Sequence, residues 1–240
     1  MTRRLGHVAL LFNLTSPAKS RKNRRAWRPR PTSQWEKPAI PVEQRFDEAI
    51  RRIDAANEED PRTEIVDGRP RPREWAFAVR VYEWVRQLAK EPSEELLLAA
   101  RAHTLRRWLI PRDRYPKTTV GYHQWRDALA QFHAQEAESI LREVGYPPEK
   151  VRTVKTLITR ENWPANKDAC VLEDADCLAF LESKLAGYLD EWGDTRTVRI
   201  LRRTIRKMTP EGQAQALKLN LGERERALLL QAAGSGTAGN

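Results

Sequence analysis

Residues 119–144 read TVGYHQWRDALAQFHAQEAESILREV, and this stretch decides the fold. Apolar side chains recur in it at helical intervals, and they are Tyr122, Trp125, Leu129, Phe132, Ile140 and Val144. A helix with 3.6 residues per turn places all of them on one face. Gly145 and the pair Pro147-Pro148 come next, and both residue types commonly end helices. The stretch therefore predicts a long amphipathic helix that ends near Val144.

The sequence on both sides of this helix predicts shorter helices with short connections. The expected ranges are 43–57, 73–90, 93–108, 148–160, 167–189, 194–207, 210–218 and 222–232. Residues 58–72 are interpreted as a polar connection rich in Pro and Arg, with Asp67-Gly68 marking a turn. Neither strand-like alternation nor an internal repeat is evident. The pattern predicts an all-α fold, a single multi-helix bundle over residues 43–233.

The two ends of the chain differ from this helical part in composition. Residues 1–42 hold ten Lys and Arg residues against one acidic residue, which accounts for most of the net charge of +10. A segment rich in Arg, Pro and Ser buries too little apolar surface to offset its chain entropy, so we expect disorder. Three interpretations stay open: a mitochondrial transit peptide, a basic arm for nucleic acid, or an over-extended gene start. Residues 234–240 predict a flexible tail.

Charge, hydropathy and cysteine content exclude several classes of protein. Residues 43–240 hold 33 basic and 32 acidic side chains, so this part does not predict a broad nucleic-acid surface. No run approaches the roughly 20 apolar residues of a membrane-spanning helix. Cys170 and Cys177 fit neither a zinc knuckle nor a redox CxxC, and we expect both to be reduced core residues. With no secretory signal evident, a cytoplasmic location is expected, or a mitochondrial one if residues 1–42 include a transit peptide.

One carboxylate falls on an apolar helical face. Asp174 lies within the apolar stripe of residues 167–189, whereas Glu173 and Asp176 are expected to point away from it. A buried carboxylate needs a partner. Asp174 therefore has two interpretations: an ion pair or a bonded backbone amide, or a metal ligand or general base.

Two residues of the long helix have the same ambiguity. His133 and Glu136 lie on or beside its apolar face, three residues apart, so their side chains can meet or share a ligand. They are either satisfied core residues or catalytic and metal-binding candidates. His103 is expected at the surface, because helical spacing over residues 93–108 turns it away from the apolar stripe.

The most distinctive chemistry lies in residues 106–116, RRWLIPRDRYP. Guanidinium groups bind phosphate or carboxylate in a bidentate fork, and aromatic rings add stacking surfaces. The candidate substrate-binding residues are Arg106, Arg107, Arg112, Trp108 and Tyr122. The start of the long helix nearby also offers free backbone amides to an anion. The alternative is a structural corner of Trp packing and Arg–Asp pairs. A Walker loop, a GxGxxG motif and a Ser-His-Asp context are all lacking.

A series of short motifs resembles a known family. In chain order they are Arg45-Phe46-Asp47-Glu48-Ala49-Ile50, Asp54-Ala55-Ala56-Asn57, Asp60-Pro61, Arg106-Arg107-Trp108, Ile110-Pro111-Arg112, Tyr115-Pro116, Gly121-Tyr122-His123, Trp125-Arg126, Phe132-His133-Ala134, Leu172-Glu173-Asp174 and Phe180-Leu181-Glu182. These motifs are similar to those of the family catalogued as domain of unknown function 4202, over roughly residues 43–225. The resemblance implies a helical, cytosolic-type domain whose role is unassigned.

The helical order of that family is in turn similar to the HD superfamily of metal-dependent phosphohydrolases, which implies an HD-domain-like fold. In that superfamily, histidines and aspartates from separate helices hold a divalent metal that activates water. The similarity implies His133 and Asp174 as metal ligands, with Glu136 as a further catalytic candidate. The chain departs from the pattern, because it has no His-Asp dipeptide and Thr104 stands where the family has a histidine. A metal site without that ligand would be weakened.

Two functions are therefore expected as alternatives. One is an HD-like, metal-dependent phosphohydrolase acting on a phosphorylated small molecule or nucleotide. The other is a non-catalytic helical module that binds an anionic partner, RNA or a phosphoprotein, through the Arg- and Trp-rich corner. A degenerate homologue that keeps only the fold is a third possibility, which Thr104 leaves open. Neither of the first two functions involves a membrane.

Overall fold

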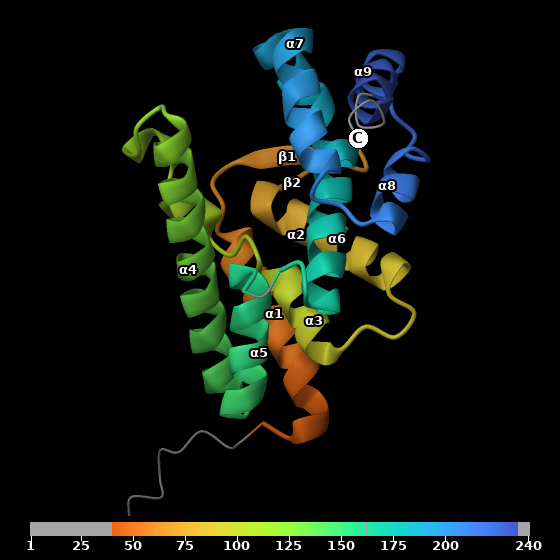
Figure 1. Ribbon diagram of the computed structural model, residues 1–240. Helices are drawn as coiled ribbons and strands as arrows, with labels where there is room; N and C mark the ends of the chain where they lie inside the picture. Colours follow the sequence, from red (N-terminus) through yellow and green to blue (C-terminus); the bar gives the residue numbers. More distant parts are fainter. Residues whose placement is uncertain (1–39, 162, 235–240) are drawn as a thin grey trace, which may run out of the picture. The chain divides into compact units, whose positions relative to one another are not determined.

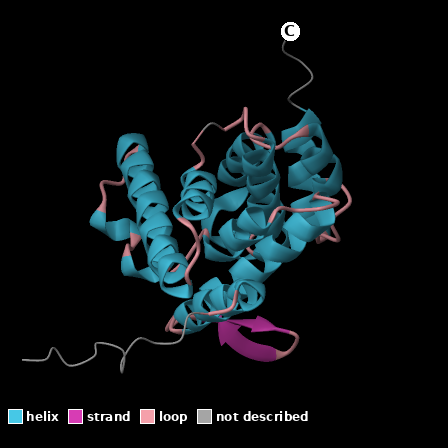
Figure 2. Cartoon of the chain, turned by 90° about the horizontal axis from the view of Figure 1, so that it is seen from below, coloured by secondary structure: helices cyan, strands magenta, loops and turns pink. Residues whose placement is uncertain are grey.

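The computed structural model describes residues 40–161 and 163–234, and this part of the chain is almost entirely helical (Figures 1 and 2). The all-α prediction is therefore confirmed. The α-helices are α1 (Arg45–Glu58), α2 (Arg73–Leu88), α3 (Glu94–Ala102), α4 (Thr119–Val144), α5 (Pro148–Thr159), α6 (Lys167–Ser183), α7 (Leu185–Ile205), α8 (Pro210–Ala216) and α9 (Glu223–Gly234). Short 3-10 helices occur at Val42–Gln44, Arg107–Leu109 and Arg112–Arg114. The disorder expected for the two ends falls mainly on residues 1–39 and 235–240, outside the described residues.

The long helix α4 has the predicted bounds. Its first turn is capped by Thr118, whose hydroxyl accepts a hydrogen bond from the Gly121 amide at 3.0 Å. Its last turn ends at Gly145, which has a φ of +93° that glycine adopts without strain. No described helix is long and apolar enough to cross a membrane.

Residues 58–72 contain a β-hairpin that the sequence interpretation missed. Strand β1 (Thr63–Val66) pairs antiparallel with β2 (Arg69–Pro72), and Asp67-Gly68 connects them. Both turn residues have positive φ, +49° and +72°, as in a type I′ hairpin turn. Figure 2 shows the hairpin beside the helices. The turn was predicted correctly, but two four-residue strands with Arg and Pro on one of them gave no visible alternation.

Helix α6 lies at the centre of the packing. One hydrophobic cluster joins it to α1, α2, α3, α4 and α5, through α6 residues such as Leu172 and Ala175. The other cluster joins it to α7, α8 and α9, through residues such as Leu178 and Leu181. Because α6 packs on both sides, most of its middle is buried, and polar side chains there, such as Glu173 and Asp174, are held inside the protein.

Helix α3 is shorter than predicted. It ends at Ala102, and residues 103–106 form turns before the 3-10 helix that starts at Arg107. Arg106 adopts the left-handed conformation with a φ of +52°, which ends any helical continuation. The chain direction therefore changes within the segment that carries His103, Thr104, Arg106 and Arg107, and this change decides where each side chain points.

Candidate functional site

His133 is held inside the protein by α4. Its side chain is 2% exposed, and its Nδ1 lies 2.7 Å from the carbonyl oxygen of Leu105. A neutral ring that donates from Nδ1 to this carbonyl leaves a lone pair on Nε2. The Nε2 atom is buried and has no hydrogen-bond partner among the described residues. Burial, and then the charge of Arg107, lower the pKa of His133 to about 3, so the ring is neutral at physiological pH.

His103 is buried as well, so the prediction that it lies at the surface was wrong. His103 still has helical backbone angles as the C-cap of α3, but residues 98–105 are all buried, so this part of the chain has no outward face. Its Nδ1 lies 2.9 Å from the carbonyl oxygen of Ala100, and its Nε2 lies 3.4 Å from Asp176 Oδ1. The contact between His103 Nε2 and Asp176 Oδ1 does not have hydrogen-bond geometry, but it allows an ion pair when the His103 ring is protonated. The two histidines thus leave the same atom, Nε2, without a hydrogen bond.

Three partly buried cations lie around this histidine pair. They are Arg107 beside the α3 turn, Arg126 on α4 and Lys184 between α6 and α7. None of the three forms an ion pair with a described carboxylate. The Arg107 guanidinium lies 4.9 Å from the Trp125 ring, and the Lys184 ammonium lies 3.6 Å from the Phe77 ring. We call the region bounded by Arg107, Arg126 and Lys184 the basic cleft.

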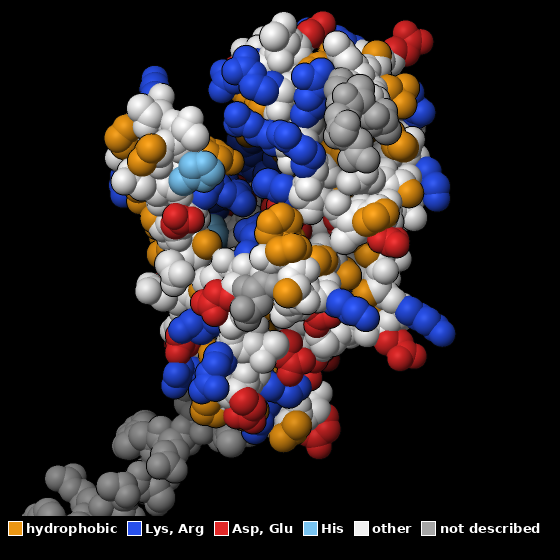
Figure 3. Space-filling model, viewed as in Figure 1, with side chains coloured by type: hydrophobic (Ala, Val, Ile, Leu, Met, Phe, Trp, Pro, Cys, Tyr) orange, Lys and Arg blue, Asp and Glu red, His pale blue; other side chains and the backbone are white. Residues whose placement is uncertain are grey.

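The charges of the basic cleft act on one another. Burial lowers the pKa of Arg107, and the like charge of Arg126 adds to this fall, while Glu74 and Asp176 oppose it. Burial also lowers the pKa of Lys184 to about 8; Glu74 opposes this fall, and Arg107 adds to it. Figure 3 shows a hollow between α4 and α7, and Lys and Arg side chains gather around it. The cations therefore repel one another in a region that an anion could enter.

The structure contradicts a second prediction, which placed Glu173 and Asp176 of α6 facing outward. Glu173 was expected to point outward but is 3% exposed, and Asp176 is also turned toward the interior. Arg160 binds both, donating from Nε to Glu173 and from Nη2 to Asp176 at 2.9 Å. Lys207 approaches Glu173 at 3.2 Å. Although burial opposes it, His103 and Arg160 lower the pKa of Asp176 well below its usual value. These two carboxylates are therefore neutralised from within the protein.

Asp174 is buried as predicted, but its contacts are structural. Its Oδ1 accepts a hydrogen bond from the Thr209 amide at 2.9 Å, and its Oδ2 accepts one from the Thr209 hydroxyl. Gly212 in α8 leaves the room that Asp174 fills, because a Cβ there would lie 2.4 Å from the carboxyl carbon. Burial raises the pKa of Asp174, and the Thr209 hydrogen bonds oppose the rise. Asp174 thus fixes the start of α8 on α6.

The predicted metal ligands do not meet in this arrangement. His133 bonds Leu105 and Asp174 bonds Thr209, and no contact joins the two side chains. Across residues 40–161 and 163–234, no three His, Cys, Asp or Glu side chains are grouped closely enough to hold a metal ion. The group next to His133 is the cation Arg107, which repels a divalent metal. The donor set therefore does not fit the divalent metal that the HD similarity implies.

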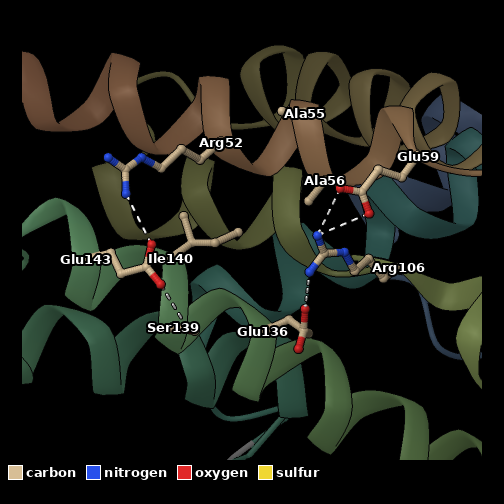
Figure 4. Close-up of a pocket in the computed structure, with 9 residues that line it drawn as sticks. All are labelled: Arg52, Ala55, Ala56, Glu59, Arg106, Glu136, Ser139, Ile140 and Glu143. Atoms are coloured by element: carbon tan, nitrogen blue, oxygen red, sulfur yellow. Dashed lines mark hydrogen bonds and ion pairs between the residues drawn. The ribbon is translucent and has the colours of Figure 1, made fainter.

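Two other predicted site residues lie in a separate groove between α1 and α4 (Figure 4). This α1–α4 groove has a volume of about 310 Å³. In it, Arg106 donates to Glu136 at 2.8 Å and to both carboxylate oxygens of Glu59 at 3.1 and 3.2 Å. Arg52 and Glu143 form a further pair at 3.3 Å. Each charge that lines the groove has an opposite charge beside it, so Arg106 and Glu136 are already neutralised.

The remaining candidates form a corner around Trp125. Its Nε1 donates to the Ile110 carbonyl at 2.9 Å, and Arg107 and Arg112 lie over its ring. Arg112 donates to the carbonyl oxygens of Tyr115 and Pro116 at 2.9 and 2.8 Å. The Tyr122 ring is 44% exposed and lies 5.9 Å from the Trp125 ring. Trp108 is partly buried within the 3-10 helix. Of the three predicted arginines, Arg107 alone has a guanidinium that donates to no described residue.

Sequence interpretation missed Lys184, Asp176 and His103 as part of the site. Arg126 follows Trp125 in one of the motifs shared with the family, but no role was assigned to it from the sequence. Lys184 had no signal of this kind, because the sequence placed it inside the predicted helix 167–189, whereas in the structure α6 ends at Ser183 and α7 begins at Leu185. Only the packing of α6 and α7 against α2 brings it to the Phe77 ring.

Comparison with known proteins gives one family. The family model described as Domain of unknown function (DUF4202) matches residues 47–229. Neither a curated protein nor a solved structure matches the chain.

Proposed function

This chain belongs to the domain of unknown function (DUF4202) family, and we propose that this member binds a small phosphorylated anion in the basic cleft. The observation that carries the proposal is the set of unpaired cations, Arg107, Arg126 and Lys184. Placing like charges together in a partly buried region is unfavourable unless an anion offsets them. Elsewhere on the described residues, buried cations such as Arg160 have carboxylate partners. The cations of the cleft have no such ion pair: Glu74 and Asp176 act on Arg107 only at a distance, and a bound anion would supply the direct contact.

A phosphate group fits these cations better than a single carboxylate does. Two guanidinium groups offer forks of N–H donors, and an ammonium adds a point charge. A phosphate monoester carries close to two negative charges at pH 7 and three strong acceptor oxygens. A nucleotide or a phosphorylated metabolite provides such a group, and partly exposed rings near the cleft, such as Tyr122, offer stacking surface to its remainder.

The neighbours Arg106 and Arg107 allow a matched test. Titration calorimetry with inorganic pyrophosphate and adenosine monophosphate would compare Arg107→Gln with Arg106→Gln in the full chain. We expect Arg107→Gln to weaken binding about 30-fold, since charge-assisted hydrogen bonds contribute roughly 1.5–3 kcal/mol. Arg106→Gln should change affinity less than about twofold, because its guanidinium is held by Glu59 and Glu136. No binding by the wild-type protein, or an equal loss in both variants, would refute the proposal.

Hydrolysis of the bound phosphoester stays a prediction. A divalent metal at His133 and Asp174, the predicted mechanism, has no supporting contact, and no catalytic step is assigned to it. Metal analysis of the purified protein and a panel of phosphomonoesters and nucleotides with added Mg²⁺, Mn²⁺ or Zn²⁺ would test it. Turnover that His133→Gln and Asp174→Asn both abolish, in variants that melt as the wild type does, would support the HD-like enzyme. Turnover independent of either residue would rule that mechanism out.

The alternative proposal, RNA or phosphoprotein binding through the Arg- and Trp-rich corner, has weaker support. Arg106 and Arg112 there already donate to protein oxygens. Arg107 is the remaining donor of that corner, and it belongs to the basic cleft.

A further inference from the structure

The second half of α7 carries a dense set of basic residues. Between residues 195 and 207 there is no Asp or Glu, and the basic residues are Arg196, Arg199, Arg202, Arg203, Arg206 and Lys207. Gly193, with a φ of +69°, breaks α7 just before this segment. The charge is concentrated here although residues 43–240 as a whole are nearly neutral.

Four of these arginines lie on one face. With about 100° per residue, Arg196, Arg199, Arg203 and Arg206 fall within an arc of roughly 80°, opposite the buried Val198 and Leu201. All four side chains are exposed, and none forms an ion pair with a described residue. At 1.5 Å of rise per residue they follow one another about every 5 Å over about 15 Å. We call this face the arginine stripe.

No described carboxylate forms an ion pair with the arginine stripe, and several carboxylates of α6 and α7 are held by other cations. Asp190 and Asp194 bind Arg224 of α9, and Glu173 binds Arg160 and Lys207. Like charges three and four residues apart destabilise an isolated helix by a few tenths of a kcal/mol per pair. The stripe is therefore a set of repelling charges that an extended polyanion would relieve.

Aromatic rings lie next to Arg196, the first arginine of the arginine stripe. Tyr188 and Trp192 are stacked with centroids 4.1 Å apart and planes at 11°, and the Arg196 guanidinium lies 5.3 Å from the Trp192 ring. Phe180 lies 6.0 Å from Tyr188. Bases of single strands stack on aromatic rings and on guanidinium planes. A stacked column that ends in the first arginine of the stripe thus offers the next position to a base.

We propose that the arginine stripe and the stacked Tyr188–Trp192 pair bind a single-stranded nucleic acid, with phosphates on Arg199, Arg203 and Arg206 and a base on the Arg196 guanidinium that extends the stack. A lipid surface is a poorer partner, because membrane-bound helices insert an apolar face and that of α7 is buried against the protein. This inference does not depend on the proposed small-anion function, since it uses different residues.

The test compares two double variants of equal net charge in the full chain. Arg199→Gln/Arg203→Gln removes the middle of the stripe. Arg152→Gln/Lys218→Gln removes two exposed basic side chains, one on α5 and one just after α8. Fluorescence anisotropy with labelled 12-nucleotide oligo-U and oligo-dT, from 50 to 300 mM salt, measures affinity and its salt dependence. Thermal melts check that both variants fold.

We expect the stripe variant to bind about tenfold more weakly at low salt than the wild type. Its salt slope should fall by about 1.4, since each phosphate contact to a single strand contributes about 0.7. The control variant should change both values little. This difference between variants separates the stripe from any binding by the basic residues 1–42, which are the same in all three proteins.

Ultraviolet crosslinking of the oligonucleotide followed by peptide mass mapping gives an independent readout. We expect crosslinks on the peptide that contains Tyr188 and Trp192. Equal losses in both double variants, crosslinks confined to residues 1–42, or tighter binding to a 12-base-pair duplex or to phosphatidylserine vesicles than to single strands would overturn the proposal. Loss of small-anion binding in Arg107→Gln with oligonucleotide binding intact would show that the two sites act separately.

Discussion

Arg106 and Arg107 are consecutive residues, yet they lie in two regions with opposite charge compensation. Arg106 reaches into the α1–α4 groove, where Glu59 and Glu136 take up its donors (Figure 4). Arg107 reaches into the basic cleft, where its guanidinium lies over the Trp125 ring and its neighbours include Arg126. The left-handed backbone at Arg106 is what separates the two directions. Charge type alone thus does not distinguish the two regions; what distinguishes them is whether the protein supplies an ion-pair partner.

The largest expected effect is the loss of stability when the carboxylates Glu173 and Asp176 lose their shared ion-pair partner, Arg160. Arg160→Gln leaves Glu173 and Asp176 without their shared partner, and breaking a buried ion pair costs several kcal/mol. Because Arg160 is partly exposed and Lys207 still approaches Glu173, we expect a loss of about 2–3 kcal/mol in the free energy of unfolding by urea. Arg142→Gln breaks the exposed pair with Glu138 and should cost at most about 0.5 kcal/mol. Equal losses of stability in the two variants would mean that the ion pairs of Arg160 do not stabilise the fold more than an exposed pair does.

The second expected effect concerns Lys184 in the basic cleft. Its pKa of about 8 means that the ammonium is charged below pH 8 and neutral above it. Phosphate affinity should therefore fall about five- to tenfold between pH 7.5 and pH 9, as the unliganded protein loses this charge. Lys184→Arg keeps the charge at both pH values and should flatten the profile. A wild-type affinity that does not change over this range would remove Lys184 from the anion site.

The third effect is an acid sensitivity at His133. In the unfolded chain its pKa is near 6.5, whereas in the fold it is about 3, so below pH 6.5 only the unfolded chain gains a proton. Stability should then fall by about 1 kcal/mol between pH 6 and pH 5 because of this residue alone. Urea unfolding of His133→Gln should show a smaller fall, whereas the exposed His123→Gln should behave as the wild type does. Parallel curves for all three proteins would contradict the low pKa.

The smallest expected effect is the difference in stability between the variants Arg106→Gln and Arg107→Gln. Arg106→Gln should lower the free energy of unfolding by about 0.5 kcal/mol, because it removes a partly exposed pair of ion contacts. Arg107→Gln should leave stability unchanged or raise it slightly, because it removes an unpaired charge from a crowded cationic region. Thermal melts at low salt without added phosphate would measure both. A larger loss for Arg107→Gln than for Arg106→Gln would reverse the assignment of the two regions.

Sequence pattern predicted much of the fold because most helices of the chain are amphipathic or carry local end signals. Residues 119–144 show both, and α4 has those bounds. The β-hairpin was missed because its short strands are exposed and carry no hydrophobic alternation. Glu173 was placed wrongly because the middle of α6 is buried between two clusters, so residues 172–175 are all buried and periodicity there does not distinguish an outward face.

Of the candidate site residues named from the sequence, the structure brings His133 and Arg107 close together but places Asp174, Arg106 and Arg112 elsewhere. Asp174 anchors α8, and the two arginines donate to the protein itself. His103 was assigned to the surface because helical periodicity assumes one outward face, whereas residues 98–105 are buried on every side. Lys184 and Asp176 reach the cleft through contacts between helices far apart in sequence, which local spacing does not encode.

The sequence by itself determined the helical class, the family, most helix ends and the residue types able to bind an anion, because these depend on neighbours within a few positions. Only the tertiary structure decided which of those charges are neutralised by the protein and which are left over. That outcome depends on distances between α2, α4, α6 and α7, and electrostatic compensation is set by distance in space rather than by separation along the chain.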